Sequence, residues 1–517
     1  MKTTICHFFI LFIITIVSTF SYGQKSVLEL NLEPGQYAVG FKTVSQYDYS
    51  RSFSKHDAEG NLVNESGARP IQTSIWYPAE KQEESTMLFE EYTYLVANET
   101  HFPGRNDDTF EYGKKGLKTF TNSSDERFEN ELRVQTNAIK EAKAVEGLFP
   151  VIVYAPSLNS QSFENSVLCE FIASQGYIVV SSPCMGMNSR GMTVDIVGLE
   201  TQALDIGFLI SFMHTFPNAD ITNIAVMGFS WGGFSNVFAK MHNDNIKALI
   251  SLDGSVRYSP KLFRDSHFGD ISKINVPFLY LASYNYTLEE LNNSWTDGSI
   301  ISDNIYNALK FSDAYMIVFN RMSHLNFASS FIKLGKRDPK IENHQQIINK
   351  NYETVNSYVL NFLNAYLKKD NKAIDFMKNS PEQNGIEPYW LSKKFKEAEE
   401  KPPTLNEFAR ILNKNDFNNV ILTYEEITKR IPEFSLKEGE VNTWGYQLIA
   451  MKKYKKAVEV FKLNTKLYNE SANAWDSLGD GYKAKGDKEL AIKSYKKAVE
   501  INPSNSSSKR KMKELME

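Results

Sequence analysis

The 517-residue sequence predicts two folded units: an α/β unit in which helices cover both faces of a mostly parallel sheet, and an all-α unit after about residue 400. The first prediction depends on short apolar runs that alternate with longer amphipathic stretches, because this alternation is typical of parallel strands joined by helical crossovers. The second depends on a helical pattern that recurs at a fixed offset. The hydrophobic content of 42% is that of an ordinary globular chain.

Six short runs in the first unit are apolar and bounded by turn or polar residues, which indicates buried strands. They are Val151–Tyr154, Ile178–Val180, Ile224–Met227, Ala248–Leu252, Phe278–Leu281 and Met316–Phe319. Two earlier strands are predicted at Tyr37–Phe41 and Ile71–Tyr77. Helical patterns lie between and after the main strands, at Phe163–Gln175, Glu200–Phe216, Phe234–His242 and Asn343–Leu367.

The predicted α/β unit covers residues 24–370, and residues 85–145 interrupt its pattern. This stretch is polar and rich in charge, with scattered aromatic residues. Two interpretations stay open, a cap over a site and a solvated surface excursion. A linker is predicted over residues 371–403, before the all-α unit of residues 404–517.

The all-α unit contains a repeat whose copies are 34 residues apart. The matching pairs are Gly445 and Gly479, Leu448 and Tyr482, Ala457 and Ala491, and Phe461 and Tyr495. Small residues let two helices approach, and large residues fill the gap between them. The pattern closely resembles the tetratricopeptide repeat, most strongly over residues 470–503. Such repeats stack on their neighbours, and the resemblance implies a surface for a protein partner.

The N-terminal residues have the pattern of a secretory signal peptide. Lys2 supplies a positive charge, Phe8–Val17 is apolar, and small residues follow before Gln24. We therefore expect residues 1–23 to be removed and the protein to be exported, either to a periplasm or out of the cell. The alternative is an uncleaved anchor, but the apolar run is short for a spanning helix.

Composition gives no sign of several other functions. The formal net charge of −4 does not indicate a nucleic-acid partner. The sequence has no metal-binding signature, so no metal is expected. No segment after the signal peptide is expected to be long and apolar enough to cross a membrane. Export leaves two cysteines, Cys169 and Cys184, and whether they pair stays open.

The most informative motif is Gly-Phe-Ser-Trp-Gly-Gly at residues 228–233. It follows the predicted strand Ile224–Met227 and precedes a helical stretch, which is the context of a nucleophile elbow. The glycines at 228 and 232 avoid collisions in a turn that exposes Ser230 above the sheet. The helix N-terminus adds partial positive charge there. The motif therefore predicts Ser230 as a nucleophile, and a structural glycine turn is the alternative.

A serine hydroxyl is a poor nucleophile without a base, and histidine is the usual one. His324 follows the predicted strand Met316–Phe319 and comes after Ser230 in the chain, as expected of the base. His267 is the only serious rival, because the other histidines lie in helical stretches or before the sheet core.

An acid is expected to orient the base. Many enzymes of this kind place it after the strand equivalent to Phe278–Leu281, but no carboxylate follows that strand closely. Asp253 ends the preceding strand, Ala248–Leu252, and would point into the crevice at the carboxyl edge of the sheet. A turn aspartate that caps the strand end is the alternative, and Glu289 and Glu290 are the substitute acids.

Ser230, Asp253 and the His-x-Asn-Phe motif at His324 resemble platelet-activating factor acetylhydrolase, whose relatives include bacterial lipases and dienelactone-hydrolase-like esterases. The segment Arg69–Ala79 resembles an early strand of the same family. The resemblance spans residues 35–365 apart from the insertion. It implies the α/β-hydrolase fold and esterase chemistry with no cofactor.

The resemblance also implies an oxyanion hole. One donor is the backbone N–H of Trp231, directly after the nucleophile, and the other is the N–H of Leu158 in the loop after Val151–Tyr154. The family has a His-Gly pair in that loop, whereas this chain has Pro156 and Ser157.

These residues predict a carboxylic-ester hydrolase that acts through an acyl-enzyme on a small-molecule ester or lipid-like substrate. Two alternatives stay open. One is a serine peptidase with the same three residues, as in prolyl-oligopeptidase-like enzymes. The other is a non-catalytic binding protein that acts through its repeats, although the presence of all three candidate residues argues against it.

Overall fold

The computed structural model describes residues 25–517 except 58, 83–84, 124, 258–261, 263–265, 267–272, 284–304 and 336–343. The predicted signal peptide and the alternative candidates His267, Glu289 and Glu290 therefore lie outside the described residues. The chain divides into two compact units, of which the first ends at Ala398 and the second is Glu399–Glu517.

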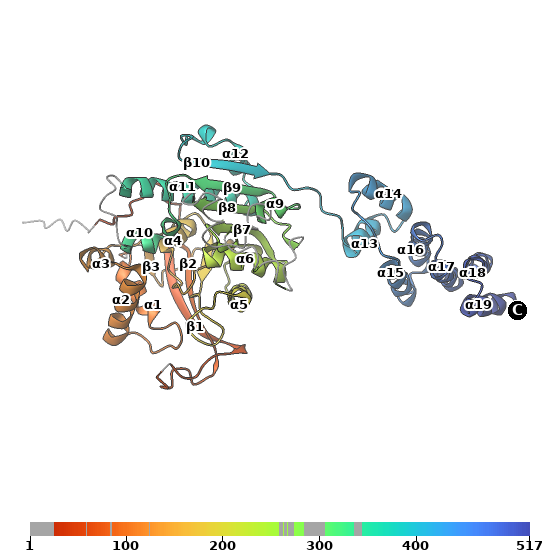
Figure 1. Ribbon diagram of the computed structural model, residues 1–517, viewed down its shortest axis with the longest axis horizontal. Helices are drawn as coiled ribbons and strands as arrows, with labels where there is room; N and C mark the ends of the chain where they lie inside the picture. Colours follow the sequence, from red (N-terminus) through yellow and green to blue (C-terminus); the bar gives the residue numbers. More distant parts are fainter. Residues whose placement is uncertain are drawn as a thin grey trace, which may run out of the picture. The chain divides into compact units, whose positions relative to one another are not determined.

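A ten-stranded sheet forms the centre of the first unit, in the spatial order β10-β9-β8-β7-β6-β4-β5-β2-β1-β3 (Figure 1). Strands β9, β8, β7, β6, β4 and β5 are parallel to their neighbours within this run. Strand β2 is antiparallel to β5 and β1, and β10 is antiparallel to β9. The strands are β1 (Ala38–Ser52), β2 (Ala68–Ala79), β3 (Ala138–Lys140), β4 (Phe149–Ala155), β5 (Ile178–Ser181), β6 (Ala219–Phe229), β7 (Ile246–Leu252), β8 (Phe278–Ser283), β9 (Ala314–Phe319) and β10 (Leu391–Lys396).

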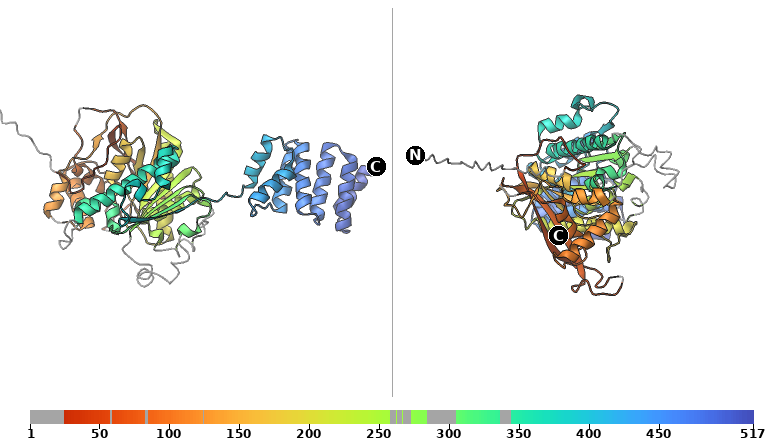
Figure 2. Two further views of the ribbon diagram at one scale, coloured as in Figure 1. Left: turned by 90° about the horizontal axis from the view of Figure 1, so that it is seen from above. Right: turned by 90° about the vertical axis from the view of Figure 1, so that its left-hand side faces the viewer.

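Helices cover both faces of this sheet (Figures 1 and 2). Helices α4 (Ser166–Ser174) and α11 (His344–Leu367) contribute to one apolar layer, and α5 (Ile196–Met213) and α6 (Trp231–His242) contribute to the other. Every residue of the central strand β4 is buried, because both of its faces meet a layer of helices. The predicted α/β fold class is confirmed. Cys169 lies in one layer and Cys184 in the other, both as free thiols.

The insertion of residues 85–145 forms helices α1 (Thr93–Val96), α2 (Asp107–Thr121) and α3 (Asp125–Leu132), followed by strand β3. Its side chains Phe89, Tyr92, Leu117 and Phe128 are buried in the same apolar layer as α4 and α11. Strand β3 pairs with β1 and extends the sheet. A solvated excursion is therefore the wrong interpretation for these buried parts, because they belong to the core.

Residues 371–396 differ from the predicted linker. They form helix α12 (Asn371–Lys378) and strand β10, and β10 pairs with β9 from Leu391 opposite Phe319 to Lys396 opposite Ala314. Strand β10 has a single buried residue, Leu391, and carries three lysines, which is typical of an edge strand that must not pair further. That composition is also why the segment has the pattern of a linker.

Helix α5 is the one described helix that is long and apolar enough to cross a membrane by length and composition. The expectation that no segment after the signal peptide has this character is therefore wrong for α5. In the structure α5 packs against α6 and against strands β4 and β6, and 56% of its most apolar window is buried.

Further short helices of the first unit are α9 (Ile305–Ala308) and α10 (Ser329–Leu334). The second unit is a series of helices, α13 (Leu405–Lys414), α14 (Val420–Arg430), α15 (Glu438–Ala450), α16 (Tyr454–Leu467), α17 (Ala472–Lys485), α18 (Lys488–Ile501) and α19 (Ser506–Met516). A Cβ on Gly445 would lie 2.3 Å from the ring of Phe461, and one on Gly479 would lie 2.4 Å from the ring of Tyr495. The repeat of a small residue facing a ring therefore sets how closely successive helices pack, and the predicted helical repeat is confirmed.

Candidate active site

Ser230 lies in a tight turn between β6 and α6. Its backbone angles are φ 52° and ψ −113°, which a non-glycine residue adopts at a cost of about 1–3 kcal/mol. The turn leaves no room for side chains beside it. A Cβ on Gly228 would lie 2.4 Å from the carbonyl carbon of Gly232, and one on Gly232 would lie 2.0 Å from the carbonyl oxygen of Ala155. The sequence-predicted elbow therefore has the backbone geometry expected of it.

The structure brings the three sequence-predicted side chains together. His324 Nε2 lies 2.9 Å from Ser230 Oγ, and His324 Nδ1 lies 2.8 Å from Asp253 Oδ2. The imidazole is 36% exposed, whereas the Asp253 carboxylate is fully buried. With Nδ1 protonated, the imidazole donates to Asp253 and can accept the Ser230 hydroxyl proton at Nε2. The predicted acid at the end of β7 therefore contacts the predicted base.

Ser283 is a further partner of Asp253, and no motif in the sequence indicates this contact. Its hydroxyl donates to Asp253 Oδ2 at 2.6 Å, and its N–H donates to Oδ1 at 3.1 Å. Ser283 ends strand β8, which pairs with β7, the strand that Asp253 follows. This chain therefore has a hydrogen-bond donor at that strand end and the carboxylate on the strand beside it.

The loop after β4 carries Leu158 and lies directly against the elbow, because Gly232 contacts Ala155 and Pro156. Among the residues that the structure describes, neither the N–H of Leu158 nor that of Trp231 has a hydrogen-bond acceptor. An oxyanion hole requires backbone donors that are not already used, and both of these N–H groups meet that condition.

Glu164 fixes the loop after β4 through buried hydrogen bonds. Its buried carboxyl accepts the N–H of Ser157 at 2.9 Å and the hydroxyl of Tyr154 at 3.1 Å, and the Ser157 hydroxyl also donates to it. Burial raises the pKa of Glu164, and the hydrogen bonds from Ser157 oppose that rise. Ser157 precedes Leu158, so Glu164 fixes the residue beside the candidate oxyanion donor.

Asn165, the next residue, holds the segment behind His324. Its side-chain N–H donates to the carbonyl of Phe327 at 2.9 Å, and its side-chain oxygen accepts the N–H of Ser329 at 3.0 Å. The carbonyl of Glu164 accepts the N–H of Ser330 at 3.0 Å. The Glu164–Asn165 pair therefore ties the candidate oxyanion loop to the histidine segment through buried contacts.

The insertion supports the same segment from outside. Arg127 of α3 donates to the carbonyls of Ile332 and Gly335 at the end of α10, with 2.6 Å to the latter. Lys333 of α10 lies 3.4 Å from Glu131 of α3. Because α10 begins five residues after His324, these contacts make the insertion a brace for the histidine segment.

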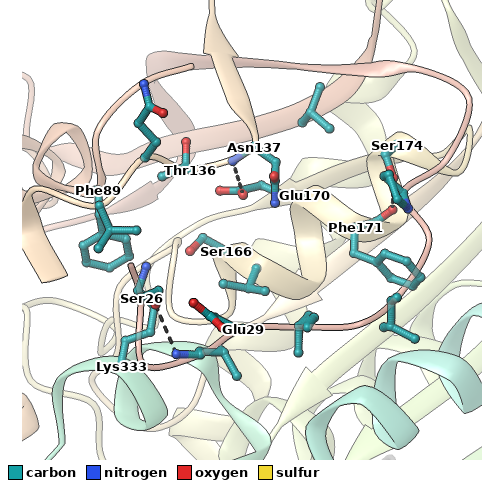
Figure 3. A pocket seen from close by; sticks show the side chains of 18 of the residues that line it. Ser26, Glu29, Phe89, Thr136, Asn137, Ser166, Glu170, Phe171, Ser174 and Lys333 are labelled. Atoms are coloured by element: carbon teal, nitrogen blue, oxygen red, sulfur yellow. Dashed lines mark hydrogen bonds between the residues drawn. The ribbon is translucent and has the colours of Figure 1, made fainter. Parts of the chain in front are cut away.

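A separate pocket of about 540 Å³ lies under the N-terminal segment (Figure 3). Glu170 there accepts the N–H of Asn137 at 2.9 Å, and Lys333 and Ser26 line the same space. Burial lowers the pKa of Lys333. None of the five sequence-predicted site residues lines this pocket, so it is distinct from the site around Ser230.

Comparisons with known proteins identify one segment of the chain. The tetratricopeptide repeat model matches residues 472–505. Among solved structures, a ferulic acid esterase from Streptomyces cinnamoneus at 2.4 Å resolution is similar, with 16% sequence identity, a TM-score of 0.49, and coverage of 72% of this chain and 100% of that chain. A likeness of this size carries no argument about activity. A search of curated proteins finds no match. The comparisons thus identify a tetratricopeptide repeat at residues 472–505.

Proposed function

We propose that this protein is an exported serine hydrolase that cleaves carboxylic esters. The observation that carries the proposal is the continuous hydrogen-bonded path from Ser230 through His324 to Asp253, at 2.9 and 2.8 Å, on a strained strand–turn–helix elbow. The resemblance to platelet-activating factor acetylhydrolase and dienelactone-hydrolase-like esterases favours esters as the substrate class.

The geometry supports an acyl-enzyme mechanism. Ser230 Oγ attacks the ester carbonyl while His324 Nε2 takes its proton, and Asp253 stabilises the imidazolium that forms. The carbonyl oxygen gains negative charge and is held by the N–H groups of Leu158 and Trp231. The imidazolium then gives its proton to the leaving alcohol. Water, activated by the same histidine, releases the acid and restores Ser230.

The other assignments of this proposal concern location and partners. Residues 1–23 would be removed as a signal peptide and leave Gln24 as the mature N-terminus, in a periplasm or outside the cell. The repeats would hold a protein partner, because they carry no nucleophile or base pattern of their own. Mass spectrometry of the exported protein tests the first assignment, since an intact Met1 would contradict it.

A fluorophosphonate probe tests the central proposal. Mature protein beginning at Gln24 is labelled beside the Ser230→Ala variant and a matched Ser211→Ala variant, whose serine is exposed on α5. We expect labelling and p-nitrophenyl ester hydrolysis in the wild type and in Ser211→Ala. Losing a serine nucleophile costs on the order of 10⁶ in kcat, so Ser230→Ala should be unlabelled and inactive. No labelling of the folded wild type would contradict the enzyme hypothesis, and cleavage of peptides in preference to esters would favour a peptidase.

A further inference from the structure

A second pocket, of about 980 Å³, lies where the insertion meets the candidate oxyanion loop. Its lining includes Asp108, Tyr112 and Lys115 of helix α2. Gln161 and Arg190 also line it. The pocket belongs wholly to the first unit. Its position gives the insertion a part in binding beyond the bracing of α10.

Gln161 is an unusual residue in this pocket. It is only 5% exposed, yet among the described residues its side-chain amide has no hydrogen-bond partner. An amide on a pocket wall that has no protein partner is available to hydrogen-bond water or a ligand. Gln161 lies three residues after Leu158, within the loop that carries the candidate oxyanion donor.

Arg190 adds further donors at the same place. Its Nε–H donates to Glu99, one N–H donates to the carbonyl of Cys184 at 2.9 Å, and another donates to the carbonyl of Asn159 at 3.0 Å. A guanidinium has five N–H groups, so two stay unused by the described protein. The side chain is 31% exposed and lines the pocket, so a ligand can reach it.

The balance of groups in the pocket favours an acceptor-rich ligand. Lys115 and Tyr112 are exposed on α2, and neither side chain has a polar partner among the described residues. Of the lining carboxylates, Asp57 accepts two hydrogen bonds from Asn61. Glu99 Oε2 accepts from Arg190, whereas Glu99 Oε1 is buried without a partner among the described residues, and burial raises the pKa of this carboxyl. Asp108 is the remaining one and is exposed in the first turn of α2, where the helix N-terminus compensates its charge.

We infer that this pocket binds a carboxylate on the non-reacting part of the ester substrate, through Arg190, Gln161 and Lys115. A carboxylate suits a guanidinium, because charge-assisted hydrogen bonds are about twice as strong as neutral ones and the two groups can pair through two parallel bonds. None of the five candidate site residues lines the pocket, but Arg190 connects it to the candidate oxyanion loop by donating to Asn159, the residue that follows Leu158. The inference rests on the proposed esterase function and names the substrate class for that same site.

The test uses two pairs of esters that differ only in a carboxylate. Mono-p-nitrophenyl glutarate is compared with p-nitrophenyl valerate, which places the charge on the acyl side. The butyrate ester of 4-hydroxybenzoate is compared with that of 4-hydroxybenzamide, which places it on the alcohol side. We expect kcat/KM to favour the carboxylate member of at least one pair about tenfold or more. The pair that responds identifies the side of the ester that enters the pocket.

Variants assign the preference to the pocket. Lys115→Ala, Gln161→Leu and Arg190→Lys should each reduce the ratio of kcat/KM within the responding pair at least threefold, chiefly by raising KM for the carboxylate ester. Lys372→Ala, which removes an exposed charge on α12, should leave the ratio unchanged. Arg190→Lys keeps a charge beside Glu99, so folding is preserved while the fork of donors is lost.

Two results would overturn the inference: ratios within twofold of one for both pairs, or a preference that none of the pocket variants changes. These outcomes are distinct from failure of the proposed function. If no ester is cleaved and Ser230 is not labelled, the esterase proposal is wrong. If neutral and carboxylate esters are cleaved equally well by a Ser230-dependent enzyme, only the pocket inference is wrong.

Discussion

Replacing Glu164 with alanine tests whether the candidate oxyanion loop depends on a buried carboxyl. The change removes the acceptor of three buried donors, the N–H and hydroxyl of Ser157 and the hydroxyl of Tyr154. Each orphaned group costs about 1–3 kcal/mol, so the loss of stability is between about 3 kcal/mol and about 9 kcal/mol unless water enters the space. A domain is stable by only about 5–15 kcal/mol, so the variant is severe.

The activity of the folded fraction is the informative quantity. If Ser157 moves, the N–H of Leu158 moves with it, and losing one oxyanion donor costs about 10²–10³ in kcat. We therefore expect Glu164→Ala to lower kcat for p-nitrophenyl esters at least about 100-fold, with a much smaller change in KM. Glu164→Gln keeps an acceptor for the Ser157 N–H and should stay within about tenfold of the wild type.

Tyr154→Phe is the matched control. It removes one hydrogen bond to Glu164, worth about 1 kcal/mol, and leaves both contacts to Ser157 in place. Its melting temperature should fall while kcat stays within about threefold. The reasoning is refuted if Glu164→Ala is folded, is less stable, and still has a kcat within threefold of the wild type.

Three further predictions concern the acid, the repeats and pH. Ser283→Ala removes the hydroxyl donor to Asp253 and should lower kcat/KM about threefold to thirtyfold with fluorophosphonate labelling retained; an unchanged kcat/KM would show that Asp253 does not need it. Gly479→Val places a side chain against Tyr495 and should destabilise the repeat unit by about 1–3 kcal/mol, seen as a lower melting temperature of the full chain by circular dichroism. Burial raises the pKa of Glu164, so its pKa in the folded protein lies above the unfolded value of about 4.3. The contribution of this carboxyl to the free energy of unfolding is therefore complete below a pH of about 4.3 and is lost as pH rises through the folded pKa. Glu164→Gln stays neutral, so urea unfolding should show it gaining stability relative to the wild type from pH 4 to 8, by at most about 1.4 kcal/mol per pH unit.

The three candidate site residues that the structure brings together share one property. Ser230, Asp253 and His324 each follow directly or closely on a short apolar run, and the carboxyl ends of parallel strands meet at one edge of a sheet. Local pattern is therefore enough to predict that they approach one another. Their catalytic role stays a prediction until labelling tests it.

The supporting residues could not be predicted, because their roles depend on contacts between distant segments. Asn165 directly precedes helix α4, where its residue type is typical of an N-cap, yet its side chain makes no capping hydrogen bond. It contacts Phe327 and Ser329 instead, more than 160 residues away along the chain. Ser283 likewise reaches Asp253 only because β7 and β8 are paired. Strand β10 was missed because an exposed edge strand buries too little to show an apolar run.

The loop after β4 shows how contacts between distant segments can replace local backbone freedom. Glycine would give the loop backbone freedom, but this chain has Pro156 and Ser157 there, and Asn159 adopts φ 58° without a glycine. Hydrogen bonds on two sides of Asn159 hold this backbone conformation. On one side, Glu164 accepts the N–H of Ser157. On the other, Asn159 accepts the N–H of Met192 at 2.7 Å through its side chain and an Arg190 N–H through its carbonyl.

Arg190 therefore takes part in both the candidate oxyanion loop and the pocket. It fixes the residue after Leu158, and it lines the pocket that the insertion encloses. A substrate group that bonds its two unused N–H donors would also restrict the loop that carries the oxyanion donor. Binding energy from a remote part of a substrate raises kcat only when it orders groups that act in the transition state. A carboxylate in this pocket can meet that condition, because the bond from Arg190 to Asn159 connects recognition to the candidate oxyanion hole through one side chain.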